Sequence, residues 1–555
     1  MKRMPLRPDL GHLKKQAKQL AAEARAGTPA ALARLRGHLP AAAGHDDAAL
    51  AAMDWRLHDA QSCLAREYGF ASWAELAGFV AARRALADDP AQAQRHWLGL
   101  VYAGDLTGSL DGAQPAVAAR LLAAQPGLAA GDPLLACAVG DLAAVEAAIA
   151  RDAGWVHRPG GPLQLPPLLA VTHSSLLRLP AFRAGLHACA QRLLAAGADP
   201  GQQVGSRWPP ASLQAPSATE RLSALYGAAG QNHDAALTRL LLAAGADPND
   251  GESLYHALEH PECTRLLLEA GARVTGTNAL YRVLDLDALP QLELLLAHGA
   301  DPNEPAAGPP TSDWGRPLLW AIRRRRSAAH VAALLRAGAD PRARTPDGTD
   351  AATLALRHGL PEVAALLAAA GLLPPSAAQA PDELFVAACA RGDEAEARCL
   401  QARHPDWPAA LAPAQLRLLP ELAATGCLDG VRCMLRLGWP VATPGGDWQA
   451  SALNHAVFRG DAEMARLLLA HGAQWTERHG FGDDCSGTLS WASVNRPDGP
   501  GDWLGCAQAL VAHGMPGARP DPQAADTVLL DGRRKRFSDE VTDFLLDAGT
   551  PRQPA

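Results

Sequence analysis

The chain has 555 residues, and 48% of them are apolar although only 5% are aromatic. Its formal net charge of −7 lacks the basic excess that general binding to a nucleic-acid backbone requires. Runs of about eighteen apolar residues do not occur, so the sequence predicts no membrane span. Lys14 and Lys15 come before any apolar run long enough for a signal peptide, and we therefore expect a cytoplasmic protein.

Ten cysteines are scattered singly along the chain, without a Cys-x-x-Cys spacing or a disulfide framework. This usage indicates a reducing environment in which thiols serve as small apolar residues. Most of them fall within helical apolar patterns, where we expect burial: Cys137, Cys189, Cys389, Cys399, Cys433 and Cys506.

Residues 1–83 predict a small helical module. An amphipathic helix is expected over 9–27, where apolar residues recur at helical spacing opposite lysines, and a second helix over 28–38. Gly69 stops a further helix before a last one around Trp73. Residues 84–131 are helical but out of period, and we expect them to form an irregular leading repeat.

From Asp132 onward one block returns with a period near 33 residues. The block consists of a small residue, an amphipathic helix ending in a leucine pair, and a glycine that ends the helix; residues 460–472 show it in full. Such a period is typical of one helical unit stacked on itself, and therefore of a solenoid. Further copies end at Gly197, Gly245, Gly271, Gly299, Gly338, Gly514 and Gly549.

Polar or Pro/Gly-rich stretches interrupt the period, and we expect them to be loops between units. A last helix is expected over 538–547, followed by Gly549 and Pro551. The interruptions lie at about 155–180, 200–220, 303–315 and 478–502.

The turn that closes several blocks resembles the Gly-Ala-Asp turn of ankyrin repeats. Glycine suits the left-handed end of a helix, alanine permits close packing, and aspartate can accept hydrogen bonds in the turn. Matching turns are 197–200, 245–249, 299–303 and 338–341, and 341–349 resembles the hairpin finger between two units.

The resemblance implies an all-α ankyrin-repeat solenoid of about eleven or twelve units over 132–550. In ankyrin repeats a histidine at the start of the first helix ties neighbouring fingers together. This chain never has histidine there; a tyrosine hydroxyl could replace it in part and a leucine could not, so we expect shorter or less ordered fingers. The position holds Tyr226, Tyr255, Tyr281, Leu319, Asn454 or Ser490.

The N-terminal module resembles the short helical segment that precedes ankyrin arrays in many bacterial proteins. Residues 13–18 and 59–73 carry this resemblance. It implies a bacterial intracellular protein and no particular chemistry.

Candidate catalytic groups are few. His256, His260 and Cys263 have a spacing that superficially suits a metal, but Pro261 separates the second histidine from the cysteine. Asp483-Asp484-Cys485-Ser486 suggests a nucleophile loop, yet no base has a defined relation to it. We therefore predict no catalytic residue, no cofactor and no metal.

The basic run Arg323–Arg326 could contact an acidic partner or simply lie in solvent. The second basic run, Arg533–Arg536, looks like a nuclear signal, which a bacterial origin argues against. We expect Trp314 and Trp448 to lie in fingers, where a large aromatic residue is a common interface anchor. Trp320 and Trp491 follow the histidine position and are expected in the core.

The predicted function is a non-enzymatic scaffold that binds a protein partner through the concave face of fingers and first helices. One alternative is an enzyme or effector with its activity in the 478–502 insertion, through Asp483 and Asp484, or in the N-terminal module. Another is nucleic-acid binding by that module through Lys14, Lys15, Lys18 and Arg34. The predicted partner-binding residues are Trp314, Trp448, Gln449, Asp461, Asp250, Thr277, Arg325 and Arg326.

Overall fold

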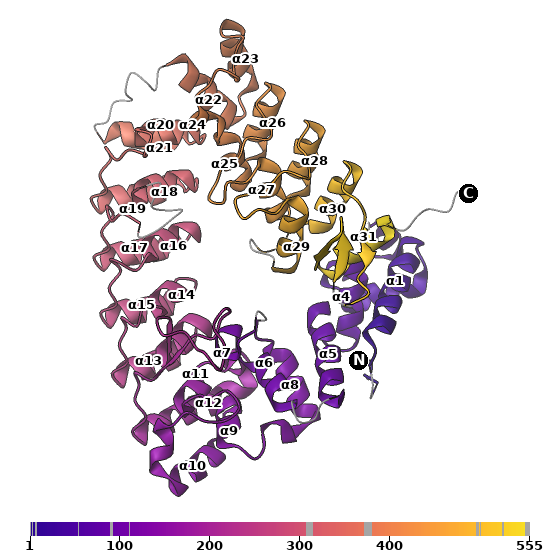
Figure 1. Ribbon diagram of the computed structural model, residues 1–555, viewed down its shortest axis with the longest axis vertical. Coiled ribbons are helices and arrows are strands. Elements are labelled where there is room, and N and C mark those ends of the chain that lie inside the picture. Colours follow the sequence, from indigo (N-terminus) through magenta and orange to yellow (C-terminus); the bar gives the residue numbers. More distant parts are fainter. Residues whose placement is uncertain are drawn as a thin grey trace. The chain divides into compact units, whose positions relative to one another are not determined.

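The computed structural model is mostly helical (Figure 1). Its contacts divide the chain into two compact units, Met1–Arg273 and Val274–Ala555. The predicted boundaries at 83 and 131 stay predictions, because these contacts mark only the division after Arg273. The structure describes residues 2, 4–5, 8–53, 55–88, 93–109, 112–306, 315–370, 380–495, 499, 501–523 and 527–549.

The first unit begins with two helices that fall within the predicted spans 9–27 and 28–38, and it continues into short helical pairs. Its elements are α1 (Leu10–Arg25), α2 (Pro29–His38), η1 (Pro40–Ala42), α3 (Asp47–Ala51), α4 (Leu57–Glu67), α5 (Trp73–Asp88), α6 (Ala93–Val101), α7 (Gly104–Thr107), α8 (Pro115–Ala124), η2 (Pro126–Ala129), α9 (Pro133–Val139), α10 (Leu142–Arg151), η3 (Ala153–His157), α11 (Pro167–Thr172), η4 (Ser175–Arg178), α12 (Pro180–Ala195), β1 (Gln203–Gly205), β2 (Arg221–Ser223), η5 (Tyr226–Gln231), α13 (Ala235–Ala243), α14 (Ser253–Ala257) and α15 (Pro261–Glu269).

The second unit consists of further helical pairs and ends in a small sheet and a last helix. Its elements are α16 (Ala279–Asp285), α17 (Leu289–Ala297), α18 (Pro317–Arg323), α19 (Ala328–Arg336), α20 (Ala351–Arg357), α21 (Pro361–Ala369), α22 (Pro381–Arg391), α23 (Glu394–Arg403), α24 (Pro413–Leu416), α25 (Leu418–Ala424), α26 (Leu428–Arg436), α27 (Ala452–Arg459), α28 (Ala462–Ala470), α29 (Cys485–Asn495), α30 (Trp503–Ala512), β3 (Arg519–Pro520), β4 (Val528–Leu530), β5 (Arg533–Lys535) and α31 (Asp539–Gly549).

Each repeat is a pair of short helices with clear start and stop signals. In the pair α27 and α28, Gly460 ends the first helix with a φ of 68°, a left-handed conformation that glycine adopts without strain. Asp461 then caps the second helix, because its carboxylate accepts a hydrogen bond from the N–H of Met464 at 3.0 Å. The same cap is formed by Asp141 in α10 and by Asp234 in α13.

The pairs stack into two rows of helices. In the second unit α16, α18, α20 and α22 contact one another in succession, as do α25, α27 and α29. We call these first helices of each pair the inner row. The second helices form another row, in which α17, α19 and α21 contact in succession, as do α26, α28 and α30. This all-α stack of helical pairs confirms the solenoid that the period predicts.

Asparagine side chains join successive closing turns. The Asn303 carboxamide donates a hydrogen bond to the carbonyl of Gly338 at 2.8 Å and accepts one from the N–H of Asp340 at 2.7 Å. Asp301 in turn accepts a hydrogen bond from the N–H of Asn303 within its own turn. Each Gly-Ala-Asp-Pro-Asn turn of this kind is therefore ordered locally and coupled to the next repeat.

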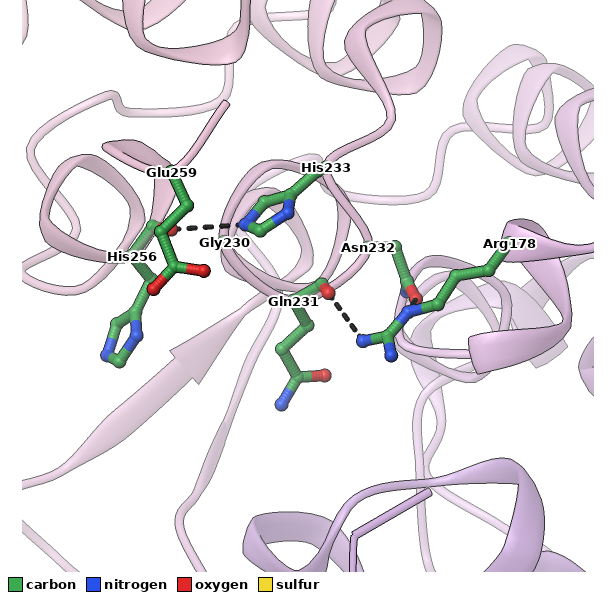
Figure 2. A pocket seen from close by; sticks show the side chains of 7 residues that line it. All are labelled: Arg178, Gly230, Gln231, Asn232, His233, His256 and Glu259. Atoms are coloured by element: carbon green, nitrogen blue, oxygen red, sulfur yellow. Dashed lines mark hydrogen bonds between the residues drawn. The ribbon is translucent and has the colours of Figure 1, made fainter. Parts of the chain in front are cut away.

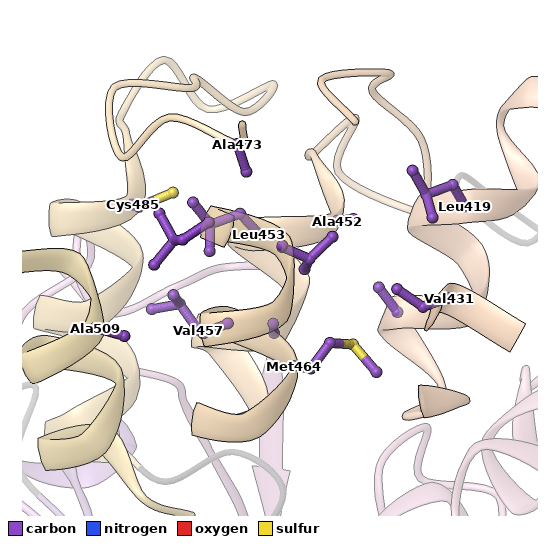
Figure 3. Close-up of a cluster of buried hydrophobic side chains, with 14 of the residues drawn as sticks. Leu419, Val431, Ala452, Leu453, Val457, Met464, Ala473, Cys485 and Ala509 are labelled. Atoms are coloured by element: carbon purple, nitrogen blue, oxygen red, sulfur yellow. The ribbon is translucent and has the colours of Figure 1, made fainter. Parts of the chain in front are cut away.

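The core is a continuous layer between the helices, as the cluster in Figure 3 shows for the second unit. Leu453 and Val457 of α27 are fully buried, as are Met464 of α28 and Cys485 of α29. These side chains come from consecutive repeats. A single helical pair could not bury them, and the stacking of one repeat on the next does. Trp320 is fully buried as predicted, and its indole N–H donates to Asp285 at 3.0 Å.

Two small antiparallel sheets were not predicted. Strands β1 and β2 pair Val204 with Leu222; β1 lies inside the predicted insertion at 200–220, and β2 directly follows it. Strands β3, β4 and β5 form a three-stranded sheet near the C-terminus. Their strands have only two or three residues, too short to show an alternating pattern in the sequence.

Two further expected insertions are not simply loops. The stretch at 155–180 contains α11, and much of 478–502 is α29, which belongs to the inner row. The thiols are free and mostly buried as predicted, but Cys399 is exposed. The apolar pattern that places Cys399 in the core is therefore wrong, because only Ala397 is buried in α23.

Candidate functional site

Five aromatic side chains gather at one side of the repeats around α27 and α29. We call them the aromatic face: Trp448, Phe458, His479, Phe481 and Trp491. The Trp448 ring lies 5.5 Å from Phe458 and 5.0 Å from His479. Phe458 stacks on Trp491 with ring centroids 5.5 Å apart and planes only 8° from parallel. His479 also contacts Phe481, so the rings form one continuous chain.

Much of the aromatic face is exposed. Phe481 is 84% and Trp491 53% accessible to solvent, and Val494 beside them is 41% accessible. A contiguous exposed group of large apolar side chains is typical of a surface that binds a partner. Elsewhere in the described residues, the large apolar side chains with comparable exposure are Trp208 and Leu384.

Sequence reasoning found Trp448 but not the rest of this face. It placed Trp491 in the core, which is wrong because α29 turns that side chain toward solvent. It also missed Phe458 and Phe481. Phe481 did have a signal, since a large aromatic residue between Gly480 and Gly482 is not needed by a turn.

Two fingers hold these rings. The finger at 443–450 is closed by a bridge between Gly445 and Ala450, and Trp448 lies near its tip. Its neighbour is the segment before α29, where the N–H of Gly480 donates to the carbonyl of Trp448 at 2.8 Å. His455 fixes the first finger through a 3.2 Å contact between Nε2 and the carbonyl of Gly445. Burial lowers the pKa of His455.

The residues at the histidine position partly replace the missing imidazole. The Tyr281 hydroxyl lies 2.7 Å from the carbonyl of Glu304 and 2.8 Å from that of Gly315. Asn454 donates a hydrogen bond to the carbonyl of Glu477 at 2.9 Å. The replacement of the histidine by a tyrosine hydroxyl is therefore confirmed at Tyr281, and Asn454 likewise reaches a later finger.

The basic run Arg323–Arg326 is used inside the second unit. The Arg323 guanidinium is 2% exposed and donates to both carboxylate oxygens of Glu421, at 3.0 and 2.9 Å. It also pairs with Asp447. Arg323 lies on α18, and Glu421 lies on α25, three helical pairs later in the chain. Since their side chains form an ion pair, the inner row must bend enough to bring these distant repeats together.

The other arginines of this run also have internal partners. Arg324 pairs with Asp285 at 2.8 Å and with Asp447 at 2.6 Å. Arg325 donates to the carbonyl of His358, and Arg326 pairs with Asp287 at 2.8 Å. Their use as partner-binding residues stays a prediction, and it would compete with these contacts.

The remaining predicted residues lie at several different places. Gln449 is exposed at the finger tip beside Trp448, with a φ of 50°. Asp461 caps α28, and the hydroxyl of Thr277 donates to the carbonyl of Val274. Asp250 accepts a hydrogen bond from the Ser253 hydroxyl at 2.6 Å. Trp314 lies outside the described residues.

The first unit contains a polar cavity of about 480 Å³ (Figure 2). Arg178 donates to the carbonyl of Gln231 at 2.6 Å and to the side-chain oxygen of Asn232 at 3.1 Å. Figure 2 shows Glu259 on the opposite side of the cavity from Arg178. The lining offers no nucleophile beside a base, so it suits water or a small polar solute better than a reaction. Its residues are Arg178, Gly230, Gln231, Asn232, His233, His256 and Glu259.

The spacing of His256 and His260 does not produce a metal site. His256 packs against the Tyr226 ring at 5.2 Å, whereas His260 stacks on His233 at 5.8 Å. His260 also accepts a hydrogen bond from the N–H of Cys263 at 3.3 Å, which caps α15. Burial raises the pKa of the Cys263 thiol to about 11, so it is held in its neutral form.

The predicted nucleophile loop and the second basic run pair with each other. Arg533 and Lys535 of β5 reach Asp483 at 2.8 and 2.5 Å, and Arg533 also pairs with Asp484. Asp484 accepts hydrogen bonds from the N–H and hydroxyl of Ser486 at the start of α29. Cys485 is fully buried, and burial raises the pKa of its thiol. This arrangement orders a helix end and leaves no activated nucleophile.

Within the described residues, His38, Cys63 and Glu67 come close enough to hold a metal ion. Glu67 is already bound by Arg34 at 2.7 Å and by Lys2 at 2.6 Å. Burial raises the pKa of the Cys63 thiol to about 12. A protonated thiol, and a glutamate already paired with Arg34 and Lys2, do not favour metal binding. The ion pair with Glu67 also occupies Arg34, one of the residues through which the N-terminal module was predicted to bind nucleic acid.

Comparison with known proteins gives a structural likeness but no family and no function. No protein-family model matches the sequence, and no curated protein matches it. Among the solved structures that match is the crystal structure of the human ASB11 ankyrin repeat domain. It is 19% identical, the match covers 44% of this chain and 99% of that chain, and its TM-score is 0.32. The paired helices and the Gly-Ala-Asp turns are the features in which the units of this chain resemble ankyrin repeats.

None of the described helices combines the length and the apolar character that crossing a membrane requires.

Proposed function

We propose that this protein is a non-enzymatic interaction scaffold that binds a protein partner through the aromatic face of its second unit. The exposed chain of rings from Trp448 to Trp491 carries the proposal. Phe481 and Trp491 leave much apolar surface in water, and a partner that covers it would gain the free energy of that burial.

The repeats around the aromatic face support this role, because several of their polar contacts hold the elements that carry the rings in fixed positions. The Arg323–Glu421 pair, the contact of His455 with the carbonyl of Gly445 and the Asp461 cap hold α25, the finger at 443–450 and the pair α27–α28 in place. The rings are thus displayed by ordered elements, which lowers the entropic cost of binding.

Photo-crosslinking in the native cytosol tests the proposal. A benzoyl-phenylalanine placed at Phe481 should form a discrete adduct with one protein, and Trp491→Ala should reduce the adduct. The same probe at Leu384, an exposed residue of α22 outside the face, is the matched control. Equal adduct patterns at 481 and 384, or an adduct indifferent to Trp491→Ala, would count against the proposal.

A further inference from the structure

Two arginines flank the aromatic face without an ion-pair partner. Arg478 is exposed and directly precedes His479, whose ring lies against Trp448. Arg536 is also exposed, and its backbone carbonyl accepts a hydrogen bond from the Ser490 hydroxyl at 2.7 Å, one residue before Trp491. Neither guanidinium forms an ion pair within the described part of the chain.

The carboxylates at the face, by contrast, are already neutralised. Asp447, next to Trp448, is held by Arg323 and Arg324. Asp483, close to Phe481, is held by Arg533 and Lys535. The face therefore combines exposed apolar rings with two exposed arginines that form no ion pair among the described residues, although the whole chain carries a net charge of −7.

This combination discriminates between possible ligands. Aromatic rings alone could hold an organic cation, but the two arginines would repel it. Bases of single-stranded nucleic acid stack on such rings too, yet proteins that bind them line a whole groove with basic residues. Carboxylates interspersed with apolar side chains would satisfy both features of the face.

We propose that the partner presents an acidic peptide segment, whose apolar side chains cover Phe481 and Trp491 while its carboxylates pair with Arg478 and Arg536. This inference rests on the proposed function of the aromatic face. Opposite charges at the rim would mainly speed association and exclude wrong partners, and the rings would supply most of the affinity.

Fluorescence anisotropy with the full chain tests the proposal. The probes are labelled peptides of about twelve residues in which leucine alternates with glutamate, glutamine or lysine, together with an oligothymidylate of similar length. We expect the glutamate peptide to bind at least about tenfold more tightly than the other three, and added salt to weaken its binding.

Substitutions of the two arginines test whether they cause the preference for the glutamate peptide. Arg478→Glu combined with Arg536→Glu should weaken binding of the glutamate peptide about tenfold or more. Both side chains are exposed and unpaired, so the fold should persist, which circular dichroism and an unchanged melting temperature would verify. Arg466→Glu is the matched control, because Arg466 is exposed on α28, in the row of second helices, and its replacement should leave binding unchanged.

Several outcomes would overturn the inference: no binding of the glutamate peptide, equal binding of the glutamine or lysine peptide, or tighter binding of the oligothymidylate. If the adduct at position 481 persists with wild-type yield in the Arg478→Glu/Arg536→Glu protein, the acidic segment is wrong while the proposed function stands. If the adduct itself fails to form, the proposed function fails.

Discussion

Asn303 shows how single side chains set the order of this stack. Its carboxamide acts as donor and acceptor for two backbone groups of the following closing turn, Gly338 and Asp340. His358 shows the opposite case, a polar ring sealed in an apolar and positively charged setting. Each residue leads to a measurable expectation.

Asn303→Ala should lower the free energy of unfolding by about 1–3 kcal/mol, because two hydrogen bonds between repeats are lost. Urea unfolding followed by circular dichroism measures this. His298→Ala changes an exposed side chain close to the same turn, and its effect should stay within about 0.5 kcal/mol. Equal effects of both variants would show that the carboxamide does not couple the repeats.

Lowering the pH should destabilise the second unit through His358. Burial, with Arg325, Arg323 and Arg357 nearby, lowers the pKa of His358 to about 3, whereas an unfolded histidine titrates near 6.5. The unfolded chain therefore binds the proton first, and stability is lost as the pH falls below about 6.5 toward 3.

His358→Asn removes this titration. Between pH 6 and 4 the wild-type free energy of unfolding should fall more steeply than that of the variant, by about 1.4 kcal/mol per pH unit. His298→Gln, at the surface, should keep the wild-type slope. Parallel slopes for wild type and His358→Asn in urea melts at several pH values would contradict the prediction.

At the scale of elements, the second helix of a repeat depends on its buried face. Leu468 of α28 is fully buried in the layer between repeats, whereas its neighbour Leu467 is only partly buried. The two leucines share one helix and differ in the face they occupy. They therefore form a matched pair for measuring what stacking contributes.

Leu468→Ala should cost about 2–5 kcal/mol, since it removes buried methyl groups and leaves a cavity. Leu467→Ala should cost clearly less. Guanidinium melts of both variants provide the comparison, and a larger loss at Leu467 would mean that the face of α28 assigned to the core is wrong.

Some elements of the fold could be predicted from the sequence, whereas others depend on contacts that the sequence does not reveal. The glycines and aspartates around Gly460 and Asp461 predict the helical pairs, because local conformation depends on those residues alone. Trp491 could not be placed, since a helical pattern does not reveal which neighbour covers it. The partnership between Arg323 and Glu421 was equally hidden, because it depends on how far the inner row bends.

On the scale of the whole molecule, the network around Arg323 departs from ordinary solenoid behaviour. Repeats normally contact only their neighbours, so stability adds up from one interface to the next. Here α18 is tied to α25 and to the finger before α27. The repeats between α18 and α25 are therefore enclosed by two elements that are bonded directly to each other.

Arg323→Met should cost about 3–5 kcal/mol, because it leaves the Glu421 carboxylate buried without its partner. Adding Glu421→Met should restore much of that loss. Urea unfolding of both single variants and the double variant measures the coupling. Additive losses would show that the pair contributes no specific link between these repeats.

The same link has a mechanical consequence. If the chain is pulled from its ends, a simple stack should peel off repeat by repeat, each step releasing roughly 11 nm for about 33 residues. The ion pairs of Arg323 with Glu421 and Asp447 join the two ends of the stretch from α18 to the finger at 443–450. We therefore expect this stretch to resist the force and then unfold in a single step that releases roughly 45 nm of chain. Optical-tweezer traces of the wild-type and Arg323→Met chains would show the large step in the first and its division into smaller ones in the second.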